Sequence, residues 1–350
     1  MNDKEKTIER PRREHCSCCI MPEAPDHVVF DDEGVCDICR RRDALARQHG
    51  SFGKTDGEQK LNLLKKKVNR FRNDGPYDCV CSVSGGKDSL MTLYIAKKIL
   101  GLRPLAVMID SGFSLPEMPE NLANATDALG IDSVIFKVSD IQDLFKLFLK
   151  SKRRIYYCRL CHALLDWKIH EIAQRFDVKL ILGGYTKGQQ YIRNSELFWI
   201  YDVSDKNAID LLSEYPQYRE LTELVANQTA FFHKRYPEIA QISPFKYVKW
   251  DEREIVELLT KELGFKRSSR SWPTNSSNCL FNHVSQYLAE KDFGYAQHEV
   301  ELSELVRDGE MTRQRALDIC ESPISGEAIE ESLEKLGLSM DALEGERKDA

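Results

Sequence analysis

Short apolar runs alternate with segments of helical periodicity through the middle of the chain. The apolar runs predict strands at residues 77–83, 103–110, 133–138 and 179–183, and the first of them is expected to be buried. Between them, apolar residues recur at helical spacing and predict helices at residues 90–100, 115–129, 141–150 and 163–176. Strands that alternate with helices in this way predict an α/β fold built on a doubly wound parallel sheet.

A glycine-rich turn joins the first predicted strand to the first predicted helix. This turn, called the SGGKDS loop below, consists of Ser84, Gly85, Gly86, Lys87, Asp88 and Ser89. Adjacent glycines allow a close backbone approach, and the free N–H groups at a helix start favour an anion. Lys87 adds positive charge, and we expect Asp88 to position Mg²⁺. The spacing differs from that of a Walker A loop, so we interpret the turn as a different phosphate cradle.

Ligands of doubly wound sheets lie beyond the carboxyl ends of the strands. The ends of the second and fourth predicted strands should therefore share one nucleotide pocket with the SGGKDS loop. The residues expected there are Asp110, Gly184, Thr186 and Lys187.

Two C-x-x-C pairs near the N-terminus predict a zinc knuckle. Each pair suits a tight turn that aims two thiolates at one point, and four thiolates complete a tetrahedral zinc site. A redox role for the pairs is the alternative. The expected ligands are Cys16, Cys19, Cys36 and Cys39.

A third C-x-x-C pair, Cys158 and Cys161, opens the predicted helix before the fourth strand. A helix N-terminus favours thiolate, which indicates reactive or metal-binding cysteines. Two partly buried structural cysteines are the alternative interpretation. Cys279 lies in a later loop, and taken alone it is equally typical of a buried core cysteine.

The SGGKDS loop resembles the SGGxDS motif of the PP-loop ATP pyrophosphatases. That resemblance implies cleavage of ATP to AMP and pyrophosphate, with AMP attached to a substrate oxygen. The order of motifs is similar to the N-acetyl sugar amidotransferase branch, which implies ammonia supplied by a separate glutaminase subunit. The matching segments are residues 16–22, 30–39, 84–89, 158–162, 293–295 and 309–313.

The central cysteines also resemble those of iron–sulfur-dependent PP-loop thiolases. In that reading Cys158, Cys161 and Cys279 hold a [4Fe–4S] cluster and leave one iron open for sulfide. A sulfur-donor protein would then be the partner. Three cysteines that converge on one pocket favour sulfur over ammonia, provided that they meet in the fold.

These patterns divide the chain into five expected parts around a PP-loop, HUP-like sheet. They are the zinc knuckle at 1–45, a helical connector at 46–74, the ATP-binding domain at 75–192, a helical insertion at 193–242, and a C-terminal helical region at 243–350 that completes the active site. The insertion could form the substrate pocket or a homodimer face.

Composition narrows the choice of partners. The chain has 350 residues and a net charge of −6, so no global basic field draws it to nucleic acid. A small-molecule acceptor is favoured over tRNA. The sequence contains no apolar stretch of membrane-spanning length, and its first residues are polar, so we expect a cytoplasmic protein without membrane contact.

The sequence thus predicts an enzyme that uses ATP, Mg²⁺ and Zn²⁺. Lys87 would stabilise the departing pyrophosphate while a substrate carbonyl or amide oxygen is adenylated. Sulfur would then replace that oxygen, with Cys158, Cys161 and Cys279 as catalytic or cluster-binding residues. Amidation of an N-acetyl sugar in surface-polysaccharide or nonulosonate synthesis is the alternative. A non-catalytic protein that binds zinc and nucleotide is the second alternative.

Overall fold

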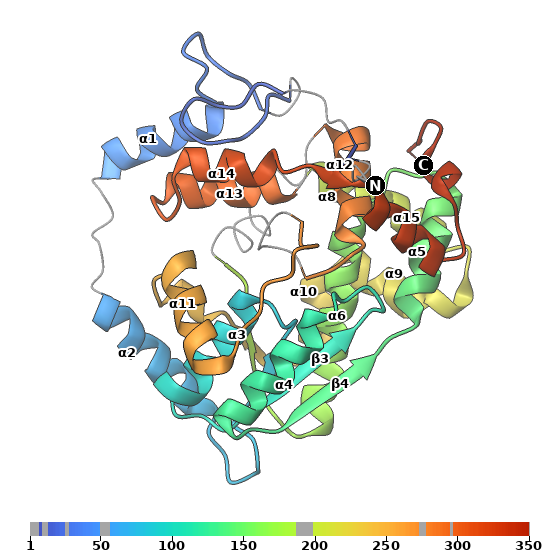
Figure 1. Ribbon diagram of the computed structural model, residues 1–350. Helices are drawn as coiled ribbons and strands as arrows, with labels where there is room; N and C mark the ends of the chain where they lie inside the picture. The colour runs from blue at the N-terminus through green and yellow to red at the C-terminus, as the bar shows by residue number, and fades with distance from the viewer. Residues whose placement is uncertain are drawn as a thin grey trace, which may run out of the picture.

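A five-stranded parallel sheet forms the centre of the molecule (Figure 1). The computed structural model describes residues 7–8, 13–24, 28–49, 57–186, 199–272, 278–294 and 297–349. The strands lie in the order β4-β3-β2-β5-β6. Their bounds are β2 Cys79–Ser82, β3 Pro104–Asp110, β4 Ser133–Lys137, β5 Leu180–Gly183 and β6 Ala240–Ile242. The predicted α/β fold with a parallel sheet is confirmed, but the three-residue β6 was missed inside the expected helical insertion.

The strand order places a topological switch point beside β2. From β2 the chain passes to β3 and β4 on one side, and then returns to β5 and β6 on the other. The connection that follows β2 therefore runs toward one edge of the sheet, and the connection that follows β5 runs toward the other edge. A crevice for a ligand forms at such a point, beyond the carboxyl ends of the two strands.

Helices cover both faces of the sheet because the strand side chains alternate between two cores. Cys81 and Leu182 face a core shared with α3 (Lys87–Tyr94), α4 (Glu117–Leu129) and α11 (Glu252–Leu263). Val80 and Ile181 face the opposite way and pack against α6 (Tyr157–Arg175). A single π-helical turn, Ile95–Ile99, continues α3. Burial on both faces explains why these strands read as continuous apolar runs.

A second apolar core joins α6 to the C-terminal part of the chain. Phe145 of α5 (Asp140–Ser151) stacks near Phe281, with 4.3 Å between the ring centroids. Ile324, Ile329 and Leu333 are fully buried in the same core. The C-terminal elements are α12 Asn282–Phe293, α13 Gln297–Arg307, α14 Arg313–Cys320, β7 Ile324–Ser325, α15 Gly326–Lys335 and a 3₁₀ turn at Met340–Leu343.

The remaining elements surround this frame. They are β1 Thr7–Ile8, which pairs with β7, α1 Asp37–His49, α2 Gly57–Val68, α8 Trp199–Leu212, α9 Arg219–Ala226 and α10 Gln228–Arg235, with 3₁₀ turns at Asn69–Phe71, Pro216–Tyr218 and Pro244–Lys246. None of the helices in the described ranges is long and apolar enough to cross a membrane.

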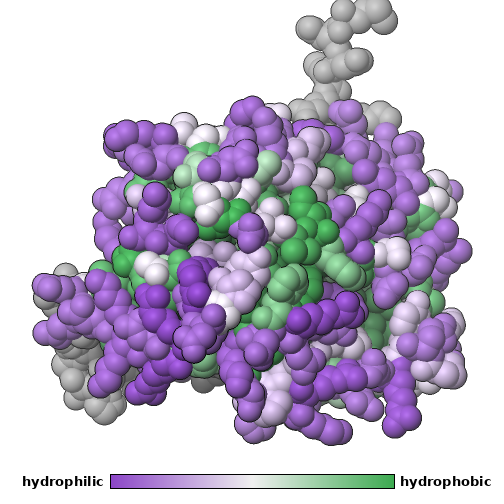
Figure 2. Space-filling view, turned by 90° about the horizontal axis from the view of Figure 1, so that it is seen from below, coloured by the Kyte–Doolittle hydropathy of each residue, from purple (hydrophilic) through white to green (hydrophobic). Residues whose placement is uncertain are grey.

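The strand β4 lies at one edge of the sheet and exposes four of its five residues. Ile135 and Phe136 of this strand are 54% and 39% exposed, and Phe176 after α6 is 41% exposed. Figure 2 views the molecule from below and shows a mostly hydrophilic surface with a smaller apolar area near its middle.

The cysteine-rich N-terminal segment is fastened to the C-terminal helices, and Figure 1 shows α1 beside α13 and α14. Arg313, at the start of α14, donates from Nε to the carbonyl oxygens of Cys16 and Cys19 at 2.9 and 2.8 Å. The backbone N–H of Ile20 donates to Ser303 Oγ of α13 at 3.3 Å. Residues almost 300 positions apart in sequence therefore share one interface.

We expect Arg313→Ala to loosen this interface. The substitution leaves two carbonyl acceptors without their charged donor, which should lower the free energy of unfolding by about 1–3 kcal/mol. Urea unfolding of the full chain measures the change. Gln314→Ala, which removes an exposed contact to Asp318 on the same helix, is the control and should stay within about 0.5 kcal/mol. Equal stability of the two variants would contradict the assigned role of Arg313.

Candidate active site

The SGGKDS loop makes a sharp turn that only glycine allows at Gly85. This residue has a φ of +80°, and a Cβ there would lie 2.3 Å from the carbonyl oxygen of Met118. Asn121 Nδ2 of α4 donates to the Gly85 carbonyl oxygen at 3.0 Å. The loop is thus held against α4 by a backbone contact and a side-chain hydrogen bond.

Hydroxyl groups fix the shape of the loop from inside. Ser89 Oγ accepts from the Ser84 N–H at 3.1 Å and donates to the Gly86 carbonyl oxygen at 2.9 Å. From outside, Asn278 Nδ2 donates to Ser84 Oγ at 2.8 Å. A Cβ on Gly86 would lie 2.3 Å from the Asn278 amide. Asn278 was not singled out from the sequence, because nothing in a polar loop 190 residues away marks it as a neighbour.

Lys87 and Asp88 begin α3 and form an ion pair, with 3.1 Å between Nζ and Oδ2. Trp250 Nε1 donates to the other carboxylate oxygen, Oδ1, at 2.7 Å. Burial alone would lower the pKa of the Lys87 ammonium, but Asp88 and Glu252 outweigh it and raise that pKa above its ordinary value. Lys87 is therefore a fixed positive charge at the helix start.

A cavity of about 260 Å³ lies at the switch point. The SGGKDS loop lines one side, one face of α6 lines another, and residues after 277 line a third. The predicted site residues among its lining are Ser84, Gly86, Lys87, Asp88, Ser89, Cys158, Cys161, Gly184 and Cys279.

The role of Gly184 is to lack a side chain, so that another part of the backbone can lie beside it. A Cβ on this residue would lie 2.8 Å from the backbone of Ser89, so glycine lets the first turn of α3 approach β5 closely. The predicted contact residues Asp110 and Thr186 lie outside the lining. Asp110 Oδ1 accepts from the Gly112 N–H at 2.8 Å, and Thr186 Oγ1 donates to Glu301 Oε1 at 2.9 Å. Lys187 lies outside the described residues.

The structure brings Cys158, Cys161 and Cys279 to the same cavity. Cys158 Sγ donates to Ser285 Oγ at 3.1 Å and to Asn282 Oδ1 at 3.4 Å. Burial raises the pKa of Cys158 to about 11 and that of Cys279 to about 12, and it raises the pKa of Cys161 as well. The expected lowering by the helix N-terminus is wrong, because desolvation dominates.

One face of α6 adds polar groups that the sequence analysis did not assign. His162 and Asp166 line the cavity one and two turns after Cys158. Tyr185, after β5, donates its hydroxyl to Asp166 Oδ1 at 2.5 Å. The four-residue spacing of Cys158, His162 and Asp166 places them on one helix face, so this signal was available in the sequence.

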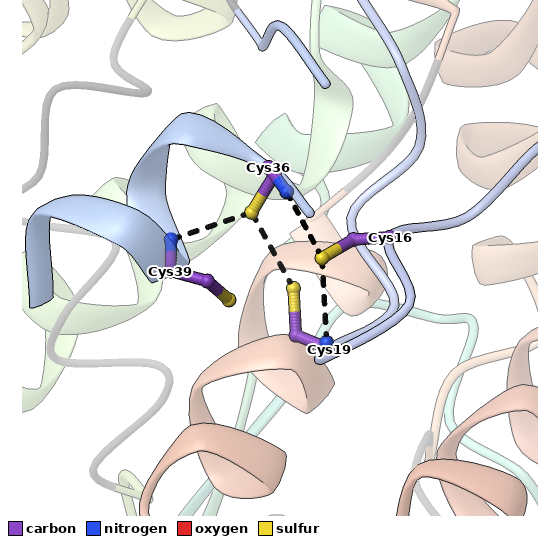
Figure 3. A group of neighbouring side chains, drawn as sticks. All are labelled: Cys16, Cys19, Cys36 and Cys39. Carbon is purple, nitrogen blue, oxygen red and sulfur yellow. Dashed lines mark hydrogen bonds between the residues drawn. The ribbon is translucent and has the colours of Figure 1, made fainter. Parts of the chain in front are cut away.

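The four N-terminal cysteines converge as predicted (Figure 3). Their sulfur atoms lie within 4.8 Å of one another, all four residues are buried, and the sulfurs of Cys19 and Cys36 are 3.8 Å apart. Four sulfurs that each lie about 2.3 Å from one ion would have this separation. Backbone N–H groups point at the sulfurs, for example from Cys36 to Cys16 Sγ at 3.2 Å. Arg307 donates to the sulfurs of Cys19 and Cys39 at 3.4 Å, which suits thiolates. The cluster fits a tetrahedral metal ion.

Comparison with known proteins finds a family model that is similar to the C-terminal part of the chain. Residues 270–346 match the family model described as LPS biosynthesis protein WbpG-like, C-terminal domain. This region contributes Asn278, Cys279, Asn282 and His298 to the cavity. The match agrees with the resemblance to the sugar amidotransferase branch.

Matches over the whole chain are more distant. The uncharacterized protein MJ1599 of Methanocaldococcus jannaschii is 23% identical over 326 residues, which cover 93% of this chain and 99% of that protein. The U34-tRNA thiolase NcsA from Methanococcus maripaludis, solved with its [4Fe–4S] cluster, has a TM-score of 0.39 and 16% identity over 88% of this chain and 89% of NcsA. NMN synthetase from Francisella tularensis has a TM-score of 0.38 and 15% identity over 75% and 89% of the two chains.

We expect Gly85→Ala to disrupt the loop. The added Cβ meets the Met118 backbone, so the loop must shift, and nucleotide binding should weaken by at least tenfold. Gly130→Ala is the matched control, because Gly130 also has a positive φ but no atom within 4 Å of the new Cβ. Gly130→Ala should lower the free energy of unfolding by only about 1–2 kcal/mol, which is the cost of a positive φ for a residue with a Cβ. Calorimetric titration with ATP measures binding, and equal affinity in both variants would contradict this account of the loop.

Proposed function

We propose that the chain binds ATP with its phosphates on the SGGKDS loop and transfers AMP to a carbonyl oxygen of a small acceptor. One observation carries this proposal. The loop presents the N-terminus of α3, two hydroxyl groups and the buried Lys87 to a cavity at the switch point. That combination of backbone N–H groups and fixed positive charge is suited to a polyphosphate.

The first half-reaction forms one bond and breaks one. The acceptor carbonyl oxygen attacks the α-phosphorus of ATP, and the bond from that phosphorus to the oxygen of the β-phosphate breaks. Pyrophosphate leaves with the bonding electrons. Lys87 and the N–H groups at the start of α3 stabilise the charge that develops on it. The sequence expectation that Asp88 positions Mg²⁺ stays a prediction; in the structure its two oxygens accept from Lys87 and Trp250.

For the second half-reaction we favour nitrogen as the incoming atom. The supporting observation is that the WbpG-like region supplies one wall of the cavity. A region of that family name suits a sugar acceptor, and the resemblance to the amidotransferases indicates an N-acetyl sugar. Ammonia from a separate glutaminase subunit would attack the carbonyl carbon. The bond from this carbon to the AMP oxygen would break, AMP would leave with the electrons, and the nitrogen would lose a proton to solvent.

Sulfur transfer is the second candidate, and the three cysteines of the cavity favour it. Cys158, Cys161 and Cys279 line the same cavity, and three thiolates could hold a [4Fe–4S] cluster with one iron open for sulfide. The sequence alone put sulfur first. We reverse that order because the WbpG-like match favours a sugar acceptor.

We also propose that Cys16, Cys19, Cys36 and Cys39 hold a structural zinc ion. All four are buried, and neither the cavity lining nor the SGGKDS loop includes them. Zinc there would join the N-terminal segment to α13, since Arg307 faces the sulfurs.

Turnover of ATP tests the proposed function. The full chain is incubated with ATP, Mg²⁺, nucleotide-linked N-acetylhexosamines and either ammonium chloride or sodium sulfide. We expect AMP and pyrophosphate with an acceptor and ammonium, and an amidated product by mass spectrometry. Lys87→Ala should reduce the rate by about 10²–10³-fold, whereas Lys98→Ala, an exposed lysine on the adjoining turn, should not.

A thiolated product would contradict the proposed transfer of nitrogen and would show that the protein transfers sulfur. ATP binding without AMP or pyrophosphate under any condition would support the non-catalytic alternative.

Metal content separates the two cysteine sites. We expect about one zinc ion per chain in protein purified without oxygen, lost in Cys36→Ser and retained in Cys18→Ser, because Cys18 is the exposed cysteine of the N-terminal segment. Elemental analysis and labile sulfide give the result. Iron and sulfide that disappear in Cys279→Ala would contradict the preference for nitrogen.

A further inference from the structure

The Asp88 carboxylate is held between two donors from distant parts of the chain. Lys87 Nζ donates to Oδ2 at 3.1 Å, and Trp250 Nε1 donates to Oδ1 at 2.7 Å. The indole bond is short and charge-assisted, which is the stronger kind of hydrogen bond. Asp88 therefore has a fixed orientation.

Trp250 contacts the second charge of the loop as well. Lys87 Nζ lies 5.7 Å from the centroid of the Trp250 ring, within the range of a cation–π interaction. The Lys87 side chain is only 6% exposed, so its ammonium is strongly desolvated. One tryptophan thus fixes both charged side chains at the start of α3.

The position of Trp250 is itself well supported. The residue is 4% exposed and belongs to the core that α3 and α4 share with α11. The next residue, Asp251, caps α11 by accepting from the N–H groups of Arg253 and Glu254. The indole can therefore act as a rigid support.

Magnesium bound to Asp88 would meet an unfavourable neighbour. Oδ2, the oxygen that does not bond Trp250, lies 3.1 Å from the Lys87 ammonium. A divalent cation on this oxygen would face that ammonium at close range with little water between them, and like charges repel strongly in such surroundings. Mg²⁺ usually keeps several waters and binds substrate phosphates together with one or two carboxylates, and the nearby Lys87 ammonium disfavours Asp88 as one of these carboxylates.

We propose that Trp250 is a positioning residue, that Asp88 anchors Lys87 for the phosphates, and that Asp88 is not a ligand of the magnesium ion that accompanies ATP. This inference rests on the proposed binding of ATP. It assigns Trp250 a role that acts through Asp88 and Lys87 rather than through contact with the substrate.

Calorimetric titration of the full chain with α,β-methylene ATP, at a series of Mg²⁺ concentrations, tests the proposal. Trp250→Phe keeps the ring and removes only the N–H donor. We expect it to weaken binding by about tenfold or more, which is the usual effect of losing a hydrogen bond to a charged group. Asp88→Asn should weaken binding as well. In both variants, the Mg²⁺ concentration that gives half of the maximal increase in affinity for the analogue should stay within twofold of the parent value.

Trp167→Phe is the matched control. Its indole N–H also makes one buried hydrogen bond, to Tyr236 Oη at 3.1 Å, but it lies outside the cavity lining. We expect unchanged affinity in this variant, and thermal unfolding verifies that all three variants are folded.

Two results would overturn the inference. One is a tenfold higher Mg²⁺ requirement in Asp88→Asn alone, which would make Asp88 a magnesium ligand. The other is unchanged affinity in Trp250→Phe, which would make Trp250 a packing residue. If the parent protein fails to bind the analogue, the proposed function fails first and the inference fails with it.

Discussion

The site depends on the close approach of backbones around the first turn of α3. Gly85 lies against the Met118 backbone of α4, and Gly184 lets the Ser89 backbone lie directly beside the end of β5. A side chain at either position would separate the loop from its neighbours. The N–H groups at the start of α3 would then no longer point into the switch-point cavity, and the charges of Lys87 and Asp88 would move with them.

Residues from distant parts of the chain hold the SGGKDS loop in this position. Asn278 braces the loop through Ser84, and Trp250 braces it through Asp88. Asn278 belongs to the region 270–346, and α15 of this region packs in the core that it shares with α6. The cysteine cluster holds the far side of this region through Arg307 and Arg313. The four-cysteine cluster therefore contacts α13 and α14 of the same region that supplies Asn278.

The sequence predicted the elements that have strong local signals. The strands β2 to β5 and the helices between them were identified, and burial on both faces explains the apolar runs of β2, β3 and β5. The SGGKDS loop was found from its residue types between a predicted strand and a predicted helix, and the four clustered cysteines were found from their spacing. The strand β6 was missed because three residues carry no periodicity. Asn278 and Trp250 were missed because their importance comes from tertiary contacts. The expected thiol activation at Cys158 was wrong because burial, which a helix-start pattern does not report, outweighs the helix dipole.

Transfer of oxygen is the most direct test of adenylation. An acceptor labelled with ¹⁸O at its carbonyl group is converted by the full chain with ATP and ammonium, and the AMP is analysed by mass spectrometry. The account predicts one ¹⁸O atom in the phosphate of each AMP formed, because the carbonyl oxygen attacks the α-phosphorus and leaves with it. Unlabelled AMP, with the label retained in the product or released to water, would contradict the account.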